Sequence, residues 1–132
     1  MNLELEDDRY CFVCGEENEN GLHLSFALVE GRVFTEITFR KVHQGYKDIV
    51  HGGLLSAVLD EAMVKASLMQ GMPAVTAEIT VRFRTPLLIN EKVIVAAEVK
   101  KVNKKIIETS AVVKKHDGML IAEARGKLFL KK

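Results

Sequence analysis

The sequence predicts an α+β fold in which an antiparallel sheet of about six strands surrounds one long helix. Apolar residues fall at every second position before residue 40 and again after residue 74, which is the period of β-strands. Between these two regions the apolar spacing becomes helical. Because short turns join most of the expected strands, antiparallel pairing is favoured over a doubly wound parallel sheet.

The first two strands are expected to form a hairpin. Apolar residues alternate through Leu22–Val29, and a second alternation runs from Val33 to Phe39. The dipeptide Glu30-Gly31 lies between these two segments and is a turn signal. We therefore expect two strands that are joined by a tight turn.

The helix follows the hairpin. Its apolar residues recur at helical spacing, namely Leu55, Leu59, Ala62, Ala66 and Met69. Gly71 and Pro73 predict its end. The helix is apolar over much of its circumference, as expected when a sheet encloses a helix.

Four more strands complete the expected sheet. The first of them places Val75, Ala77, Ile79, Val81 and Phe83 on one face, so Thr76 is expected on the opposite, polar face. The last three strands are separated by turns at Asn103-Lys104 and His116-Asp117-Gly118. Apolar positions in the final strand, including Ala122 and Ala124, indicate one buried face.

Length and composition are typical of one soluble globular domain. The chain has 132 residues, of which 48% are hydrophobic and 28% charged, and we expect a single domain over residues 1–132. A formal charge of +1 argues against nucleic acid as a partner. Met1–Arg9 is acidic and unlike a signal peptide, and charged residues interrupt the helix too often for a membrane span. The sequence thus predicts a cytoplasmic protein with no membrane partner.

Two cysteines mark the N-terminal segment, residues 1–21. Cys11 and Cys14 form a Cys-x-x-Cys motif, but the sequence has no second cysteine pair. Two alternatives would complete a metal site: His23 as a third ligand, or cysteines pooled from two chains. The favoured interpretation is a pair of reduced cysteines in a tight turn, and no metal is predicted.

The start of the helix carries the strongest chemical signal. His51 is followed by Gly52 and Gly53, and two glycines leave backbone N–H groups uncovered at the positive end of the helix dipole. Such donors can stabilise a developing negative oxygen. We expect His51 to shape this turn and orient the Gly52 amide, in preference to transferring a proton itself.

Two carboxylates lie farther along the same helix. Glu61 precedes Lys65 by four residues, so a surface ion pair explains it. Asp60 has no basic residue three or four positions away. A carboxylate partly shielded from water is suited to act as a general base or a nucleophile, whereas the alternative is an exposed helix carboxylate. Oxyanion donors and Asp60 together indicate acyl chemistry.

The spacing of these groups predicts an assembly. Gly52 and Asp60 are eight residues apart, or about 12 Å along one helix. One substrate carbonyl cannot contact both groups. If both act on one substrate, they come from different copies of the chain, which predicts a homodimer with two equivalent sites.

The segment from His43 through His51-Gly52-Gly53, with Asp60 nine residues after His51, resembles the hotdog-fold acyl-CoA thioesterases. The resemblance is to the phenylacetate-pathway-like branch, which is related to the hydroxybenzoyl-CoA thioesterases. The opening Cys11-Phe12-Val13-Cys14-Gly15 is similar to an N-terminal signature in part of that group. The resemblance implies a hotdog fold, hydrolysis of an acyl-CoA without a cofactor, and homodimers that in some relatives pair into tetramers.

The resemblance also implies catalytic roles. Asp60 matches the carboxylate that acts as general base or nucleophile, and Gly52 matches the backbone donor to the thioester carbonyl. His51 matches the histidine that orients the turn. Thr76 falls where related enzymes place a hydroxyl group near the attacking water, although an ordinary strand threonine explains it equally well.

Four further positions are expected to bind substrate. Gly53 belongs to the exposed backbone at the helix start, and Met63 is expected to help set the depth of the acyl pocket. Relatives often carry Asn or Gln six residues before the motif histidine, where this chain has Gly45 with Gln44 beside it. Either Gln44 replaces that contact or the contact is missing.

Two alternative functions remain open. One is a non-catalytic module that binds acyl-CoA. The other is a hotdog hydratase, which generally needs a carboxylate paired with a histidine, and the helix after Gly53 contains no histidine.

Overall fold

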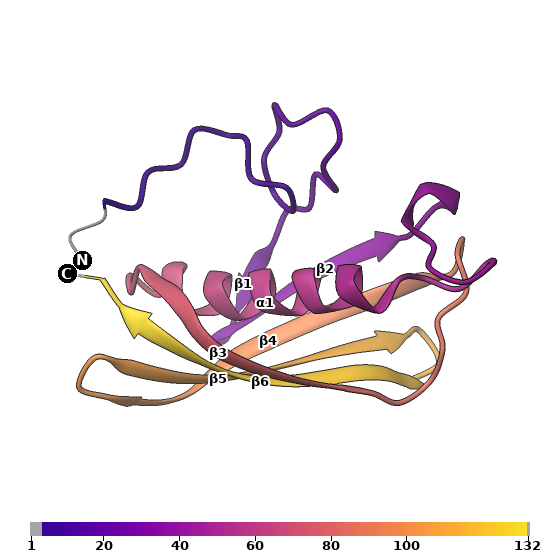
Figure 1. Ribbon diagram of the computed structural model, residues 1–132. Helices are drawn as coiled ribbons and strands as arrows, with labels where there is room; N and C mark the ends of the chain where they lie inside the picture. Colours follow the sequence, from indigo (N-terminus) through magenta and orange to yellow (C-terminus); the bar gives the residue numbers. More distant parts are fainter. Residues whose placement is uncertain (1–3, 132) are drawn as a thin grey trace.

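A long helix lies across a curved antiparallel sheet in the computed structural model, which describes residues 4–131 (Figure 1). The predicted α+β hotdog architecture is therefore confirmed. The extreme ends of the predicted domain, residues 1–3 and 132, and with them the start of the acidic Met1–Arg9 segment, lie outside the described residues. The elements are β1 (Ala27–Val29), β2 (Arg32–Thr38), the 3₁₀ turn η1 (Lys41–His43), α1 (Gly52–Leu68), β3 (Ala74–Phe83), β4 (Lys92–Asn103), β5 (Ile106–Lys115) and β6 (Leu120–Leu130).

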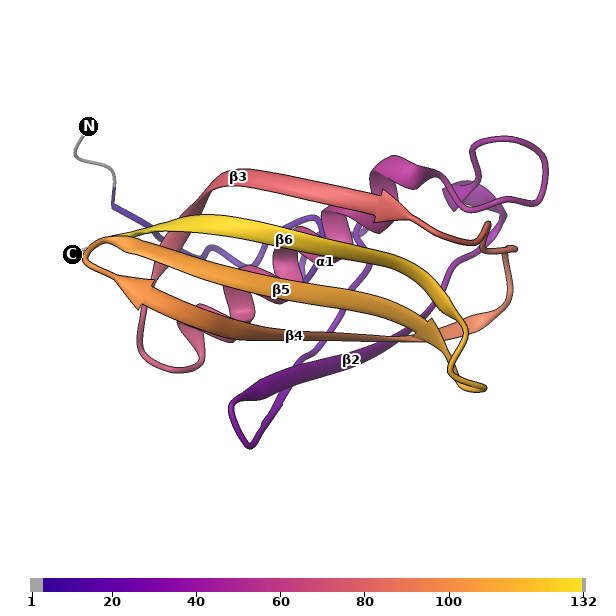
Figure 2. The same cartoon turned by 90° about the horizontal axis from the view of Figure 1, so that it is seen from below.

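The sheet has the order β1-β2-β4-β5-β6-β3, and every pairing is antiparallel (Figure 2). β3 follows α1 in the sequence and joins the sheet at the edge opposite β1. Within the described residues β3 pairs only with β6, so its other edge is free. A free edge exposes unpaired backbone donors and acceptors that can pair with another strand.

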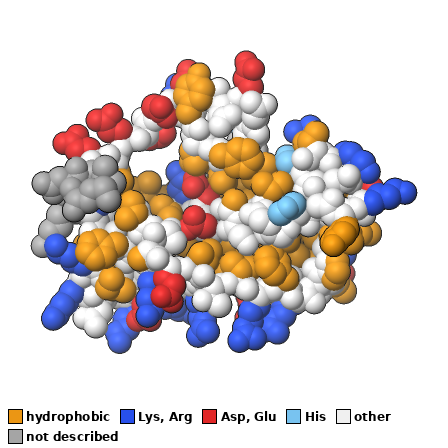
Figure 3. Space-filling model, viewed as in Figure 1, with side chains coloured by type: hydrophobic (Ala, Val, Ile, Leu, Met, Phe, Trp, Pro, Cys, Tyr) orange, Lys and Arg blue, Asp and Glu red, His pale blue; other side chains and the backbone are white. Residues whose placement is uncertain are grey.

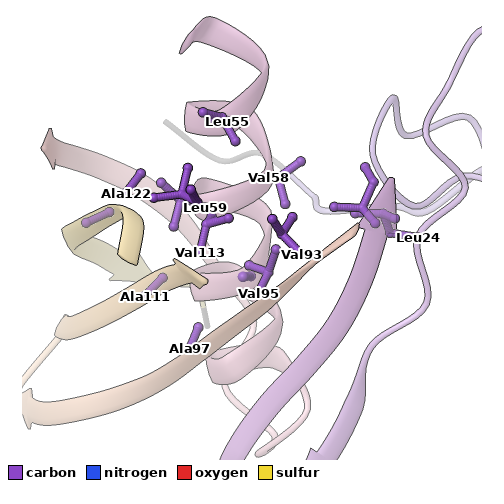
Figure 4. Close-up of a cluster of buried hydrophobic side chains, with 14 of the residues drawn as sticks. Leu24, Leu55, Val58, Leu59, Val93, Val95, Ala97, Ala111, Val113 and Ala122 are labelled. Atoms are coloured by element: carbon purple, nitrogen blue, oxygen red, sulfur yellow. The ribbon is translucent and has the colours of Figure 1, made fainter. Parts of the chain in front are cut away.

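The core lies between the helix and the concave face of the sheet (Figure 4). Leu55 and Leu59 of α1 are almost completely buried, as the helical spacing predicted, and Val58 is buried with them. They face side chains of the three central strands, among them Val93, Val95, Ala111, Val113 and Ala122. Alanines at the centre of the sheet let the helix lie close, which raises the packing density.

The first hairpin is shorter than expected. Buried Val33, Thr35, Ile37 and Phe39 confirm the alternation that includes β2, but β1 contains only three residues instead of Leu22–Val29. The reason is that the preceding backbone pairs elsewhere. The Leu22 N–H donates to the Phe12 carbonyl at 2.8 Å, and the Leu24 N–H donates to the Val13 carbonyl at 2.9 Å. These bonds attach residues 22–24 to the N-terminal segment.

A bulge in β3 changes which face its residues occupy. Thr76 pairs with Leu128 and Glu78 pairs with Lys127, so Ala77 is the extra, bulged residue. Leu128 is fully buried on the helix side of the sheet, and Thr76 shares that side. The predicted simple alternation, with Thr76 opposite Ile79, is therefore wrong, because the bulge places both residues on the inner face.

The N-terminal segment crosses α1 on the side away from the sheet (Figure 1). Its turn around Cys11 is tight: the Gly15 N–H donates to the Cys11 carbonyl at 2.8 Å, and a Cβ at Gly15 would lie 2.4 Å from the Cys11 nitrogen. Only glycine fits there.

In the part of the chain that the structure describes, no helix has both the length and the apolar character that a membrane crossing requires.

Candidate active site

The start of α1 presents one free backbone donor. His51 is the N-cap residue, and its Nδ1 accepts the Gly53 N–H at 2.9 Å. The His51 carbonyl accepts the N–H groups of Leu54 and Leu55. Among residues 4–131, no acceptor takes the Gly52 N–H. His51 therefore occupies the second glycine amide and leaves the first available to a ligand.

A cleft of about 780 Å³ opens in front of this donor. Its lining is largely apolar and comes from the loop before α1, the first turns of α1, the end of β3 and the segment that follows β3. The lining residues are Gly45, Tyr46, Ile49, Val50, His51, Gly52, Leu55, Phe83, Arg84, Thr85, Pro86 and Leu87. The volume suits an organic ligand of moderate size.

The Phe83 ring, which forms part of the cleft wall, lies close to Gly52. A Cβ at Gly52 would lie 3.3 Å from the ring of Phe83. Arg84 is the basic group of the lining, and its guanidinium is paired with Glu123 at 2.9 Å. An anion at the cleft would thus meet the helix dipole and a partly neutralised arginine.

Asp60 and Thr76 are brought together away from the cleft. The Thr76 hydroxyl donates to Asp60 Oδ1 at 2.5 Å, and both residues are half-buried. Within the described residues Oδ2 of Asp60 has no hydrogen-bond or ion-pair partner. The β3 bulge turns Thr76 toward the helix, where its hydroxyl holds one oxygen of the Asp60 carboxylate in place.

The remaining predicted substrate-binding residues divide into two groups. Gly45 lines the cleft and Gly53 adjoins it, although the Gly53 N–H is already bonded. Gln44 is turned to its own loop, where its Oε1 accepts the Asp48 N–H at 2.9 Å. Met63 is fully buried, and its sulfur and methyl group lie beside Gly126. In the single chain the cleft lining includes neither Gln44 nor Met63.

Glu61 lies in a different environment from Asp60. Both its oxygens are 3.7 Å from the Cys11 Sγ, and among the described residues it forms no ion pair with Lys65. The predicted surface ion pair is replaced by a contact with the N-terminal segment. Burial, followed by hydrogen bonding to Glu61, raises the pKa of the nearby Cys14 thiol to about 12. On the face seen in Figure 3, acidic side chains stand among hydrophobic and uncharged ones over the middle of the helix.

His43 supports the loop that leads to the site, a role that the sequence motif did not reveal. Its Nδ1 accepts the Arg40 N–H at 2.9 Å, and its carbonyl accepts the His51 N–H at 2.9 Å. The imidazole is buried and meets the Phe39 ring edge-on, with 5.7 Å between the ring centroids. In the sequence, the position of His43 at the start of the segment that ends in His51-Gly52-Gly53 was the only indication of this role.

The buried imidazole predicts an acid-sensitive loop. Burial, and secondly the Arg40 charge, lower the pKa of His43 below its usual value of 6.5. The unfolded chain therefore binds a proton at a higher pH than the folded chain does. The contribution of His43 to stability is complete above about pH 6.5 and is lost as the pH falls through the lowered pKa. We expect the melting temperature of wild type to fall more steeply than that of His43→Asn between pH 7 and pH 5; parallel curves would contradict this.

Comparisons with known proteins agree with this geometry. A sequence profile of the thioesterase superfamily matches residues 47–122, which is more than half of the chain. Acyl-coenzyme A thioesterase 13 of Homo sapiens and that of Pongo abelii are each 29% identical to it over 98 residues, covering 72% of this chain and 70% of the relative.

Solved structures extend the likeness over the fold. A crystal structure of a thioesterase superfamily protein has a TM-score of 0.87 at 26% identity and is matched over 93% of this chain, which spans only 61% of that longer protein. A Streptococcus mutans protein bound to acetyl-CoA has a TM-score of 0.77 at 16% identity, with 82% of this chain and 88% of that chain covered. The PaaI protein of the E. coli phenylacetic acid degradation operon has a TM-score of 0.78 at 22% identity, with 84% and 81% covered. At these low identities the last two show the fold alone.

Proposed function

Because the chain belongs to the thioesterase superfamily, a family of thioester hydrolases, we propose that it hydrolyses an acyl-CoA thioester to a free acid and CoA. The observation that carries this proposal is the free Gly52 amide, which opens into an apolar cleft at the positive end of α1. The names of the thioesterase 13 relatives support acyl-CoA as the substrate class.

The Gly52 N–H would stabilise the negative oxygen of the tetrahedral intermediate. A preorganised donor of this kind lowers the activation barrier by about 3 kcal/mol. Asp60 would either remove a proton from the attacking water or attack the carbonyl carbon itself. In the second case the C–S bond breaks, CoA leaves as the thiolate, and water then hydrolyses the acyl-enzyme to release the acid. The CoA thiolate is a good leaving group, so the mechanism needs little help from a general acid.

The two groups would meet across a dimer interface. Within one chain α1 and β3 run side by side in opposite directions: Gly52 lies next to Phe83, and Asp60 lies next to Thr76. If two copies of β3 pair antiparallel about a two-fold axis between Ile79 and Thr80, Thr76 of one copy lies opposite the partner's Phe83. That pairing brings each Asp60 toward the partner's Gly52 and its cleft.

Features of β3 support this pairing. Its outer edge is free within the described residues, and it presents the exposed apolar side chains of Val75 and Phe83. Edge pairing would satisfy the free backbone groups and shield part of this apolar surface. The proposed assembly is therefore a homodimer, with a tetramer of two such dimers as a further step. A strict monomer in solution would contradict the shared site.

Mixed dimers test the shared site directly. Two inactive variants, Asp60→Asn and Gly52→Pro, are co-expressed with different affinity tags, and the heterodimer is purified through both tags. One of its two sites then contains an intact Gly52 and an intact Asp60 from different chains. We expect about half of the wild-type activity in the heterodimer, with both homodimers inactive. A heterodimer as inactive as its parents would place the whole site within one chain.

Steady-state assays over short, medium, long and aromatic acyl-CoAs test the proposed reaction. Release of free CoA that saturates with acyl-CoA concentration is the expected result. Binding of acyl-CoA without CoA release would instead indicate a binding module, and hydration of enoyl-CoA would indicate a hydratase. Comparing kcat/KM across the same substrates would identify the preferred acyl group. A cytoplasmic location is a prediction from the sequence.

A further inference from the structure

Two thiols and a carboxylate converge where the N-terminal segment crosses α1. The sulfur atoms of Cys11 and Cys14 and a carboxylate oxygen of Glu61 all lie within 4.8 Å of one another. We propose that these three side chains bind a thiophilic divalent cation of the Zn²⁺ type. The sequence did not connect Glu61 with the two cysteines, because it lies 50 residues after Cys11 and an ion pair with Lys65 already explained it.

The distances suit tetrahedral coordination. Zn²⁺ lies about 2.3 Å from a cysteine sulfur and about 2.1 Å from a carboxylate oxygen, which in a tetrahedron places sulfur and oxygen about 3.6 Å apart. The observed separation between Cys11 Sγ and either oxygen of Glu61 is 3.7 Å. The two ligands therefore already stand at the spacing that a shared metal ion requires.

The backbone turn is shaped around the Cys11 sulfur. The Cys14 N–H points at Cys11 Sγ with a nitrogen-to-sulfur distance of 3.5 Å, and such a bond stabilises a thiolate ligand. Gly15 lets the backbone return to within van der Waals distance of Cys11, where a Cβ would clash. In this turn the sulfur atoms of both cysteines lie within 4.8 Å of each other.

The surrounding charges also fit a cation. Two thiolates and one carboxylate carry three negative charges, and a divalent ion would leave one. The positive charge of Lys65, which lines the same hollow as Cys14, can offset that remainder. Cys14 and Lys65 line a hollow of about 600 Å³, where a water molecule has room to complete a fourth coordination position.

Zn²⁺ takes cysteine sulfur as the deprotonated thiolate, so metal binding at Cys11 and Cys14 would release their protons. Binding would also fasten the N-terminal segment to the middle of α1.

Cobalt and zinc titrations of the reduced, chelator-treated full chain test the site. We expect one equivalent of Co²⁺ per chain, with the near-ultraviolet absorption of thiolate-to-cobalt charge transfer, and displacement of Co²⁺ by Zn²⁺. Cys11→Ser should abolish this absorption. Glu61→Gln should weaken binding by at least about 100-fold, the upper end of what residues that only orient a ligand contribute.

Controls make each outcome decisive. Glu78→Gln removes an exposed carboxylate on β3, outside the cluster, and should bind Co²⁺ as wild type does. Circular dichroism shows whether each variant is folded; if Cys11→Ser does not fold, Glu61→Gln decides alone. The proposal is overturned if wild type takes up no cobalt, if the bound cobalt lacks thiolate absorption, or if Glu61→Gln binds with unchanged affinity.

Discussion

Replacing Asp60 with Asn is expected to lower kcat for acyl-CoA hydrolysis by about 10²–10⁴-fold, the range of general acid–base catalysis. Asparagine keeps the shape of the side chain, and its carbonyl oxygen can still accept the Thr76 hydroxyl. The variant therefore removes the charge and the basic oxygen but leaves the local packing intact. KM should change little, because in either proposed role the carboxylate acts in the chemical step and does not hold the substrate. Steady-state kinetics at one pH, with a melting curve for each protein, measure both effects.

Two companion variants separate charge from position. Thr76→Val keeps the Asp60 carboxylate but removes the hydroxyl that holds it, so we expect a smaller loss, about tenfold in kcat. Glu36→Gln removes an exposed carboxylate from β2, four strands away from β3 in the sheet, and should keep wild-type kcat. Full activity in Asp60→Asn would remove Asp60 from the mechanism, whatever the other two variants show.

Hydrophobic periodicity predicted most of the fold. The helical spacing of Leu55, Leu59 and Ala62 and the two-residue spacing around Val33 and Ile37 arise from burial on one face, and these residues are buried. Periodicity failed where the backbone departs from a regular strand. The bulge at Ala77 leaves no clear mark in the local sequence, yet it decides that Thr76 faces Asp60.

Parts of the candidate site depend on contacts that local sequence patterns do not contain. The contact between Glu61 and Cys11 joins residues 50 positions apart, so the nearby Lys65 was the obvious but incorrect partner. Similarly, the sequence offered two glycine amides at the helix start. The rotamer of His51 selects between them, because its Nδ1 takes the Gly53 N–H.

Gly52→Pro tests the remaining amide, and we expect it to lower kcat by about 10²–10³-fold. Proline removes the N–H donor and nothing else that the helix needs, since the first helical position has no intrahelical acceptor to lose. The backbone is compatible with the change: His51 has φ −63° and ψ 128°, the extended conformation that a residue before proline prefers. Thermal stability should therefore stay close to that of wild type.

Gly52→Ala is the matched control for this variant. Alanine keeps the N–H but adds a Cβ 3.3 Å from the Phe83 ring, and that ring is 55% exposed and free to move aside. If the donor is what matters, alanine retains most of the activity while proline loses it, although both crowd the same wall of the cleft. Equal losses in the two variants would show that Gly52 is required for space, and the oxyanion would then need a different donor.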